Sequence, residues 1–214
     1  MSLRLQARSL ACERDDRWLF RNLDLDIGAG EIVRVEGPNG SGKTTLLKIL
    51  SGQLADYEGE LFWNERPMRE MRDAFLANLL YMGHAPGVKT VLTPLENLAW
   101  YQALAGQVRD ETARYQALEE VGLLGYEDVP AGQLSAGQQR RVALARLVLV
   151  PRPLWVLDEP FTAIDREGVA ALEQRLVVHA RRGGCVLVTT HHELTPCPEL
   201  RRIRLDEGCV DDVI

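Results

Sequence analysis

Eight consecutive residues carry the clearest chemical signal in this chain: Gly37-Pro38-Asn39-Gly40-Ser41-Gly42-Lys43-Thr44, with the spacing G-x-x-x-x-G-K-T. In such a loop, backbone N–H groups point at phosphate oxygens, and the following helix adds its positive N-terminal end. We expect Lys43 to bridge the β- and γ-phosphates of ATP and Thr44 to supply a hydroxyl ligand to Mg²⁺. The predicted nucleotide-binding segment comprises Gly37, Pro38, Asn39, Gly40, Ser41, Gly42, Lys43, Thr44 and Thr45.

Two acids follow a fully apolar run, Leu154–Leu157, later in the chain. A carboxylate at the tip of a buried strand is costly unless something compensates its charge. We therefore predict that Asp158 binds Mg²⁺ through a water molecule, and that Glu159 accepts a proton from an attacking water. Either acid alone would be interpreted as a surface residue at a strand end, but the phosphate loop favours the catalytic interpretation.

A histidine at the tip of another apolar strand is the third catalytic candidate. His191 follows residues 185–190, and its imidazole is predicted to contact the γ-phosphate and hold the attacking water. His192 is the competing candidate, whereas His179 is interpreted as an ordinary helix residue.

A second loop of small residues, Ser135-Ala136-Gly137, stands at the start of an amphipathic helix. Small residues at a helix N-terminus can hold an anion. We expect Ser135 and Gly137 to bind the γ-phosphate of ATP held by a second copy of the chain. The plainer interpretation is a capping box between Ser135 and Gln138, and both interpretations can hold together.

The order of the elements suits these motifs. Residues 31–36 are predicted to form a strand that runs into the phosphate loop, and residues 44–50 a helix after it. Residues 154–158 and 185–190 are predicted to be buried strands of a parallel sheet, separated by a helix over 165–182. Further strands are expected at residues 3–12, 23–27, 59–63, 79–82, 202–205 and 209–210, the last two joined by a turn at 206–208. Because ligands gather at the carboxyl ends of parallel strands, the three motifs are expected to converge there.

Helical periodicity dominates residues 88–149, where Thr93 is a predicted N-cap and Pro94 the first helical residue. We therefore predict a helical lobe at 88–149, inserted into a nucleotide-binding core made of residues 1–87 and 150–214.

Composition narrows the classes of function. The chain has 214 residues, a formal net charge of -6 and 46% hydrophobic residues. An acidic chain is a poor match for nucleic acid as the main partner. Because no secretory signal and no membrane-spanning apolar stretch is recognised, we expect a cytosolic protein, with other chains supplying any spanning helices. The four scattered cysteines are expected to be reduced thiols.

In this order, the motifs resemble those of ABC-transporter nucleotide-binding subunits. The resemblance covers essentially the whole chain, and Leu134–Gln139 is its most specific part because it is similar to the ABC signature. It implies a RecA-like α/β core with an inserted helical lobe and a small antiparallel β subdomain. It also implies an ATP-bound homodimer and assigns Ala163-Ile164-Asp165 to the D-loop, so that Asp165 acts in trans.

Within that superfamily, residues 80–87, 92–98 and 158–165 resemble the ATPase subunits of cytochrome c maturation systems. That resemblance implies integral-membrane permease partners of the cytochrome c maturation system, an indirect link to the haem chaperone, and a peripheral location on the cytoplasmic face of the inner membrane. ATP hydrolysis would drive haem export or release of the haem-loaded chaperone.

Three positions depart from the common ABC pattern. His84 stands where most members carry a glutamine, and its imidazole is predicted to contact Mg²⁺ or water. The plainer alternative is that His84 only shapes the loop facing the membrane subunit. No adenine-stacking aromatic is obvious, so Arg14 is predicted to stack through its guanidinium plane, with Trp18 as the alternative. Ala136 replaces a common glycine.

Three rival functions stay open at this point. The first is an ABC subunit for another substrate, and the second is a soluble ABC-type ATPase that acts on DNA or ribosomes. The third is a small-molecule kinase, which would leave Ser135–Gly137 without a purpose.

Overall fold

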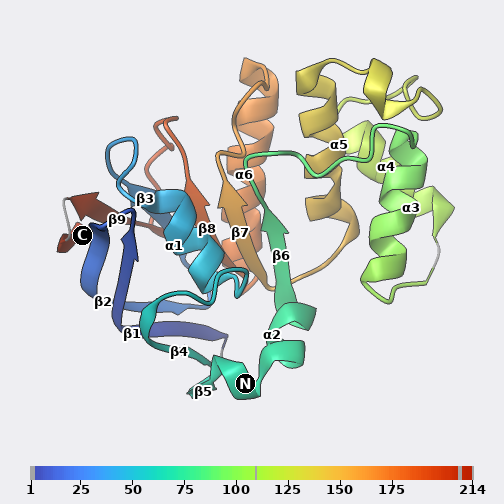
Figure 1. Ribbon diagram of the computed structural model, residues 1–214. Helices are drawn as coiled ribbons and strands as arrows, with labels where there is room; N and C mark the ends of the chain where they lie inside the picture. Colours follow the sequence, from blue (N-terminus) through green and yellow to red (C-terminus); the bar gives the residue numbers. More distant parts are fainter. Residues whose placement is uncertain (1–2, 109, 207–208, 214) are drawn as a thin grey trace. The chain divides into compact units, whose positions relative to one another are not determined.

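The structure is a computed structural model that describes residues 3–108, 110–206 and 209–213. Its strands are β1 (Arg4–Arg14), β2 (Arg17–Gly28), β3 (Ile32–Glu36), β4 (Glu58–Trp63), β5 (Arg66–Pro67), β6 (Leu79–Met82), β7 (Leu154–Asp158), β8 (Cys185–Thr189), β9 (Leu200–Asp206) and β10 (Cys209–Val213). Its helices are α1 (Lys43–Leu50), α2 (Arg72–Asn78), α3 (Pro94–Leu104), α4 (Glu111–Glu120), α5 (Ala136–Leu149) and α6 (Arg166–Arg181), with short 3₁₀ helices at Met68–Glu70 and Ala131–Gln133. Figure 1 shows this order along the chain.

Six strands form the larger sheet, in the order β10-β9-β3-β8-β7-β6. The pairs β3–β9, β3–β8 and β7–β8 are parallel, whereas β9 and β10 pair in antiparallel fashion. Val35 is in register with Thr189, and Thr189 with Asp158. The carboxyl ends of β3, β7 and β8 therefore lie at one edge, as the sequence predicted.

The centre of this sheet is fully buried. Every residue of β7 and of β8 is buried, because both strands are apolar runs that pack on both faces. One core joins them to α1, in which Leu46, Leu47, Ile49 and Leu50 are buried. The helix after the phosphate loop is therefore fixed against the sheet that presents the loop.

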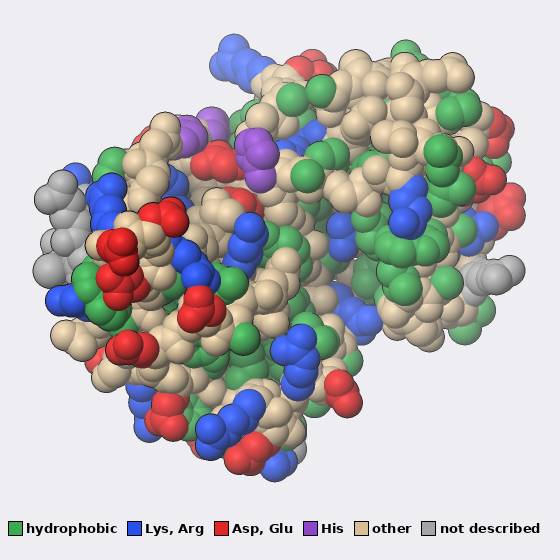
Figure 2. All heavy atoms as spheres, viewed as in Figure 1, with side chains coloured by type: hydrophobic (Ala, Val, Ile, Leu, Met, Phe, Trp, Pro, Cys, Tyr) green, Lys and Arg blue, Asp and Glu red, His purple; other side chains and the backbone are tan. Residues whose placement is uncertain are grey.

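A second, antiparallel sheet has the order β2-β1-β4-β5. In β2, buried Leu23, Leu25 and Ile27 alternate with exposed acids, the pattern predicted for this segment. On the face shown in Figure 2, basic and acidic side chains intermingle over these strands. Arg4 on β1 and Asp26 on β2 form an ion pair across this sheet, with N and O atoms 2.5 Å apart.

The chain divides into two compact units. The first contains residues 1–81, 152–159 and 173–214, and the second contains 82–151 and 160–172. The predicted division at 88 and 149 stays a prediction, because compactness alone does not define a functional lobe.

The second unit contains α3, α4 and α5. Thr93 caps α3, where its hydroxyl accepts from the Glu96 N–H and the Glu96 carboxylate accepts from the Thr93 N–H. Asn97 at the next position is wholly buried and bonds the Lys89 backbone at both N–H and C=O, 2.8 and 3.0 Å away. These bonds fix the chain that leads into α3.

The α/β fold with a parallel and an antiparallel sheet confirms the predicted fold class. The predicted turn at 206–208 includes residues 207–208, which lie outside the described residues. Among the described residues, no helix combines the length and hydropathy needed to cross a bilayer.

Candidate nucleotide site

The phosphate loop joins β3 to α1 and needs glycine at specific points. Gly37 has φ 146°, and a Cβ there would lie 2.5 Å from the Leu205 carbonyl oxygen. Gly42 is the N-cap of α1 in the left-handed region, with φ 96°. Side chains at these two positions would clash or strain the backbone, which explains the spacing of the motif.

Lys43 folds over the backbone of its own loop. Its Nζ donates to the carbonyl oxygens of Gly37 and Pro38 at 2.8 and 3.0 Å. The Ser41 hydroxyl in the same loop is buried and has no hydrogen-bond partner among the described residues. A buried hydroxyl is costly without a partner, so the loop suits a ligand rich in oxygen atoms.

Thr44 and Asp158 meet across the sheet edge. The Thr44 hydroxyl donates to Asp158 Oδ2 at 3.0 Å, and Asp158 is only 2% exposed. Thr189 donates a second hydrogen bond, 2.6 Å long, to Asp158 Oδ1. Two hydroxyl donors therefore satisfy a carboxylate that would otherwise be an unpaired buried charge.

This oxygen donor set fits Mg²⁺, which prefers one or two carboxylates together with water and substrate phosphates. The described residues contain no group of three or more His, Cys, Asp or Glu side chains suited to a metal ion. A magnesium ion at Thr44 and Asp158 would therefore depend on the nucleotide and on water for its remaining ligands.

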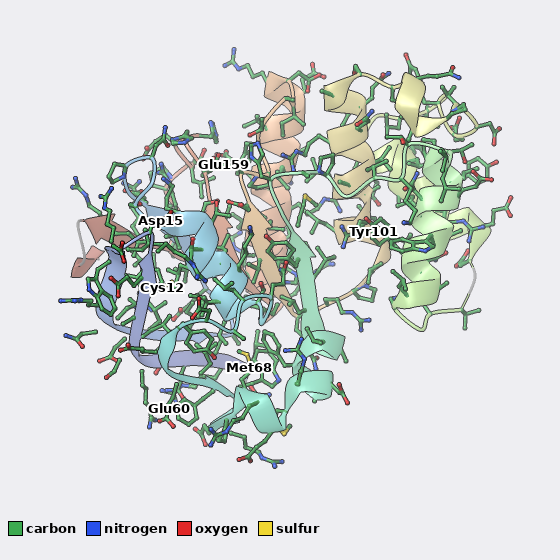
Figure 3. The ribbon with its side chains drawn as sticks, viewed as in Figure 1. Cys12, Asp15, Glu60, Met68, Tyr101 and Glu159 are labelled. Carbon is green, nitrogen blue, oxygen red and sulfur yellow. The ribbon has the colours of Figure 1, made fainter. Side chains whose placement is uncertain are left out.

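Glu159 lies beyond the carboxyl end of β7, where Figure 3 labels it. Its φ of 49° is in the left-handed region, and its N–H donates to the Thr189 carbonyl oxygen at 3.0 Å. Its side chain is 17% exposed. The backbone turn separates two adjacent carboxylates, so that Asp158 remains buried beside Thr44 while Glu159 points elsewhere.

The two competing histidines have different neighbours. The His191 N–H donates to Glu159 Oε2 at 3.3 Å, and its Nε2 lies 3.7 Å from Glu159 Oε1. The His192 ring is 2.9 Å from the Glu173 carboxylate on α6. The structure thus brings His191, rather than His192, to the predicted catalytic glutamate.

Ser135, Gly137 and Asp165 all belong to the second unit. Ser135 caps α5 in a capping box with Gln138, as the plainer interpretation predicted. A Cβ on Gly137 would lie 2.5 Å from the Ala163 carbonyl oxygen, and Arg141 forms a 2.5 Å ion pair with Asp165. The start of α5 therefore supports the segment around Asp165 within one chain, while the predicted action of these residues in trans stays a prediction.

His84 lies in the same unit, and its backbone is held by α5. Arg140, 4% exposed, donates to the carbonyl oxygens of Gly83 and His84 at 3.3 and 2.8 Å. The imidazole of His84 is exposed. Its predicted role toward Mg²⁺ remains a prediction.

Both candidates for stacking on adenine already contact other side chains in the structure. Arg14 forms an ion pair with Asp56, and its Nη2 lies 3.4 Å from the Asp56 carbonyl oxygen. Trp18 carries the Arg21 guanidinium over its ring, 3.8 Å from the centroid. Stacking by Arg14 stays a prediction.

Several residues of the site were missed from the sequence. Thr189 contacts both acids, and its only signal was a hydroxyl at the end of an apolar strand. Glu173 contacts His192, which is 19 positions away, and Arg140 contacts the backbone of Gly83 and His84, which are 57 and 56 positions away. No local pattern in the sequence reveals these contacts.

A glycine-rich loop between strand β3 and helix α1, with a carboxylate facing it from the tip of β7 in the same sheet, defines a phosphate-loop nucleoside triphosphatase. Comparison with known proteins identifies the family. The ABC transporter family matches residues 20–162, and the chain belongs to that family.

Curated relatives cover most of the chain. The cytochrome c biogenesis ATP-binding export protein CcmA of Yersinia pestis bv. Antiqua (strain Nepal516) is 56% identical over 190 residues, which span 89% of this chain and 87% of that protein. The protein of the same name from Pseudomonas fluorescens (strain Pf0-1) is 55% identical over 194 residues, spanning 91% and 92%.

Solved structures agree on the fold. A putative ABC transporter ATP-binding protein from Pyrococcus furiosus superimposes with a TM-score of 0.81 at 28% identity, covering 94% of this chain and 97% of that one. A dimeric ATP-binding cassette bound to ADP and phosphate gives 0.82 at 23% identity, covering 97% and 98%, and shows the fold alone.

Proposed function

We propose that this chain is the ATP-hydrolysing subunit of an ABC transporter in cytochrome c biogenesis, which powers haem export or the release of a haem-loaded chaperone. The observation that carries the proposal is the set of contacts at one sheet edge, Thr44 with Asp158 and Glu159 with His191. The identity of 56% to a cytochrome c biogenesis ATP-binding export protein supports the specific system.

ATP binding would exchange contacts within the loop for contacts with phosphate. Lys43 would leave the carbonyl oxygens of Gly37 and Pro38 and take the β- and γ-phosphates. The hydroxyl of Ser41, buried without a partner among the described residues, would gain one. Thr44 and Asp158 would hold Mg²⁺, which supplies charge stabilisation at the phosphates.

Hydrolysis would then depend on Glu159 and His191. Glu159 would accept a proton from the attacking water, and the water oxygen would bond the γ-phosphorus as the bond to the β-phosphate oxygen breaks. His191, whose side chain is 68% exposed beside Glu159, would hydrogen-bond the γ-phosphate and orient the water. ADP and phosphate are the products.

We further propose that ATP binds between two copies of the chain. Ser135 and Gly137 of the second copy would contact the γ-phosphate, with Asp165 near the shared boundary. The N-terminus of α5, with its Ser135 cap, supplies the partial positive charge that such a contact needs.

The membrane partner would bind the second unit. Its exposed apolar side chains include Val91, Leu104 and Val108, which are 84%, 66% and 87% exposed. Figure 2 shows hydrophobic side chains gathered on this unit. Such surfaces are typical of protein interaction sites. The His84 loop, held by Arg140, belongs to the same unit and would transmit the nucleotide state.

The decisive experiment is affinity purification of the tagged chain from native membranes, followed by mass spectrometry and an ATPase assay. We expect integral-membrane permease subunits and haem proteins to co-purify, with ATP hydrolysis that a Lys43→Ala variant lacks. A permease for another class of cargo would reassign the transporter. Hydrolysis unaffected by Lys43→Ala would contradict the assignment of the phosphate loop.

A further inference from the structure

A buried cation lies in the strand that presents the phosphate loop. Arg34 is in β3, and its side chain is only 7% exposed. Its Nη1 is 3.2 Å from Glu36 Oε1 and 3.1 Å from Glu193 Oε2. A buried guanidinium without an acidic partner would be strongly destabilising, and Glu36 and Glu193 both lie close enough to offset its charge.

Arg202 of β9 completes a group that we call the Arg34 cluster: Arg34, Glu36, Glu193 and Arg202. The Arg202 Nη2 donates to Glu193 Oε1 at 2.8 Å, and its Nε lies 3.7 Å from Glu36 Oε1. Each carboxylate oxygen of Glu193 thus lies within ion-pair distance of one arginine, and the contact with Arg202 is a hydrogen bond. Pairs that include a buried member are screened by salt much less than exposed pairs.

The cluster joins two parts of the catalytic site. Glu36 is the last residue of β3 and directly precedes the phosphate loop, whereas Glu193 is two residues after His191. The same segment also contacts Glu173, which accepts from the Thr195 hydroxyl at 2.8 Å and lies 2.9 Å from the His192 ring. The chain after β8 is therefore held both by the Arg34 cluster and by Glu173.

His191 itself has a looser attachment. Its ring is 68% exposed and lies 3.7 Å from Glu159, longer than a hydrogen bond. The position of the ring is therefore set mainly by how its neighbours hold the backbone. Of the two fastening points, only the Arg34 cluster connects that backbone to the strand of the phosphate loop.

We propose that Glu193, held by Arg34 and Arg202, is a positioning residue that places His191 relative to the phosphate loop for ATP hydrolysis. The inference rests on the proposed function, because it requires His191 to act on the γ-phosphate. In this role Glu193 would act through His191 rather than on the nucleotide itself. Its loss should therefore slow turnover and leave nucleotide affinity unchanged.

The test is steady-state ATP hydrolysis by the full-length chain carrying Glu193→Gln, which keeps the shape and removes the charge. We expect kcat to fall about tenfold, since small misplacements of a catalytic group cost one to two orders of magnitude. The Kd of a fluorescent ATP analogue should stay within about twofold, which separates orientation from uniform binding. Because Glu193 is 69% exposed, the variant is expected to fold, and circular dichroism checks this.

Glu65→Gln is the matched control. Glu65 is also an exposed member of an arginine pair, 3.4 Å from Arg4 and 75% exposed, but it lies between β4 and β5. Its kcat should equal that of the wild type. The second measurement is Glu193→Gln in a His191→Ala background, where no further loss of kcat is expected, because the residue to be positioned is gone.

The possible results separate the two claims. If Glu193→Gln lowers kcat equally with and without His191, or leaves kcat unchanged while His191→Ala lowers it, the positioning role is overturned and the proposed function stands. If His191→Ala alone keeps full turnover, the catalytic role of His191 in the proposed function fails, and the inference fails with it.

Discussion

Thr189 donates a 2.6 Å hydrogen bond from its hydroxyl to Asp158 Oδ1, and the two residues face each other in register on β8 and β7. Thr189 is wholly buried, and its hydroxyl oxygen also accepts from the Glu159 N–H at 3.1 Å. One hydroxyl therefore orients both the predicted metal-binding carboxylate and the backbone of the predicted general base.

Replacing Thr189 with valine should keep the packing and remove both hydrogen bonds. We expect the free energy of unfolding to fall by about 1–3 kcal/mol, because Asp158 loses a donor in a buried site. Half-maximal ATP hydrolysis should also require more Mg²⁺. Urea unfolding and a Mg²⁺ titration of the ATPase rate measure these effects. Thr90→Val, at an exposed position, is the control, and equal behaviour of the two variants would contradict the role of Thr189.

Glu159→Gln should bind ATP normally and hydrolyse it at least about 100-fold more slowly, because the amide cannot accept the proton. The variant should accumulate as a dimer when ATP and Mg²⁺ are present and remain monomeric with ADP. Light scattering coupled to size exclusion measures this. Wild-type turnover in Glu159→Gln would count against its assignment as general base.

Gly137→Ala should impair hydrolysis through the geometry of the second unit. A Cβ at this position would lie 2.5 Å from the Ala163 carbonyl oxygen, so the segment around Asp165 must shift at a cost of about 1–3 kcal/mol. We expect faster hydrogen exchange at 160–165 and a lower ATPase rate, with the Kd for ATP unchanged. Ala136→Ser tests a similar added atom at the exposed neighbour. Unchanged exchange in Gly137→Ala would refute the predicted clash.

His179 should make stability depend on pH. Its ring stacks on Trp155 with centroids 3.7 Å apart, and burial lowers its pKa below the ordinary value of 6.5 despite a hydrogen bond to the Pro153 carbonyl. The folded state therefore keeps the ring neutral, and below pH 6.5 the unfolded state binds more protons. This contribution is complete above pH 6.5 and is lost as the pH falls through the folded-state pKa.

The His179→Phe variant isolates this effect. Relative to the variant, the wild type should lose stability when the pH is lowered from about 7.5 to about 5.5. In the wild type, the unfolded state gains a proton on the imidazole more readily than the folded state does, whereas the phenyl ring of the variant does not titrate. Denaturant unfolding at the two pH values gives the difference. An equal difference between wild type and variant at both pH values would show that His179 does not contribute to the pH dependence.

Local patterns in the sequence were enough to predict the helices, strands and loop that carry the site. The N-cap at Thr93 and the capping box of Ser135 with Gln138 depend on residues close together in the sequence, and both are present in the structure. The strand, loop and helix of residues 32–50 follow from an apolar run, glycines and a helical pattern that adjoin one another. The convergence of the three motifs then followed from the general behaviour of parallel sheets.

Contacts between distant residues were not accessible in the same way. The contact of Arg34 with Glu193, and that of Arg140 with the backbone of His84, depend on the tertiary packing of the sheet and of α5. A charged residue inside the apolar strand β3 was a signal, but it names no partner. The bounds of helix α4 could not be predicted either, because its sequence shows no regular apolar spacing. This helix depends on packing against α3 and α5.

The left-handed backbone of Glu159, with φ 49°, has a consequence for evolution and engineering. Residues other than glycine and asparagine adopt this left-handed backbone conformation at a free-energy cost of order 1 kcal/mol. Selection for thermal stability alone would therefore favour glycine or asparagine at position 159, and each such variant would gain stability while losing ATP hydrolysis. A thermostability screen of this chain must therefore also measure activity, because its most stable variants would otherwise include inactive ones.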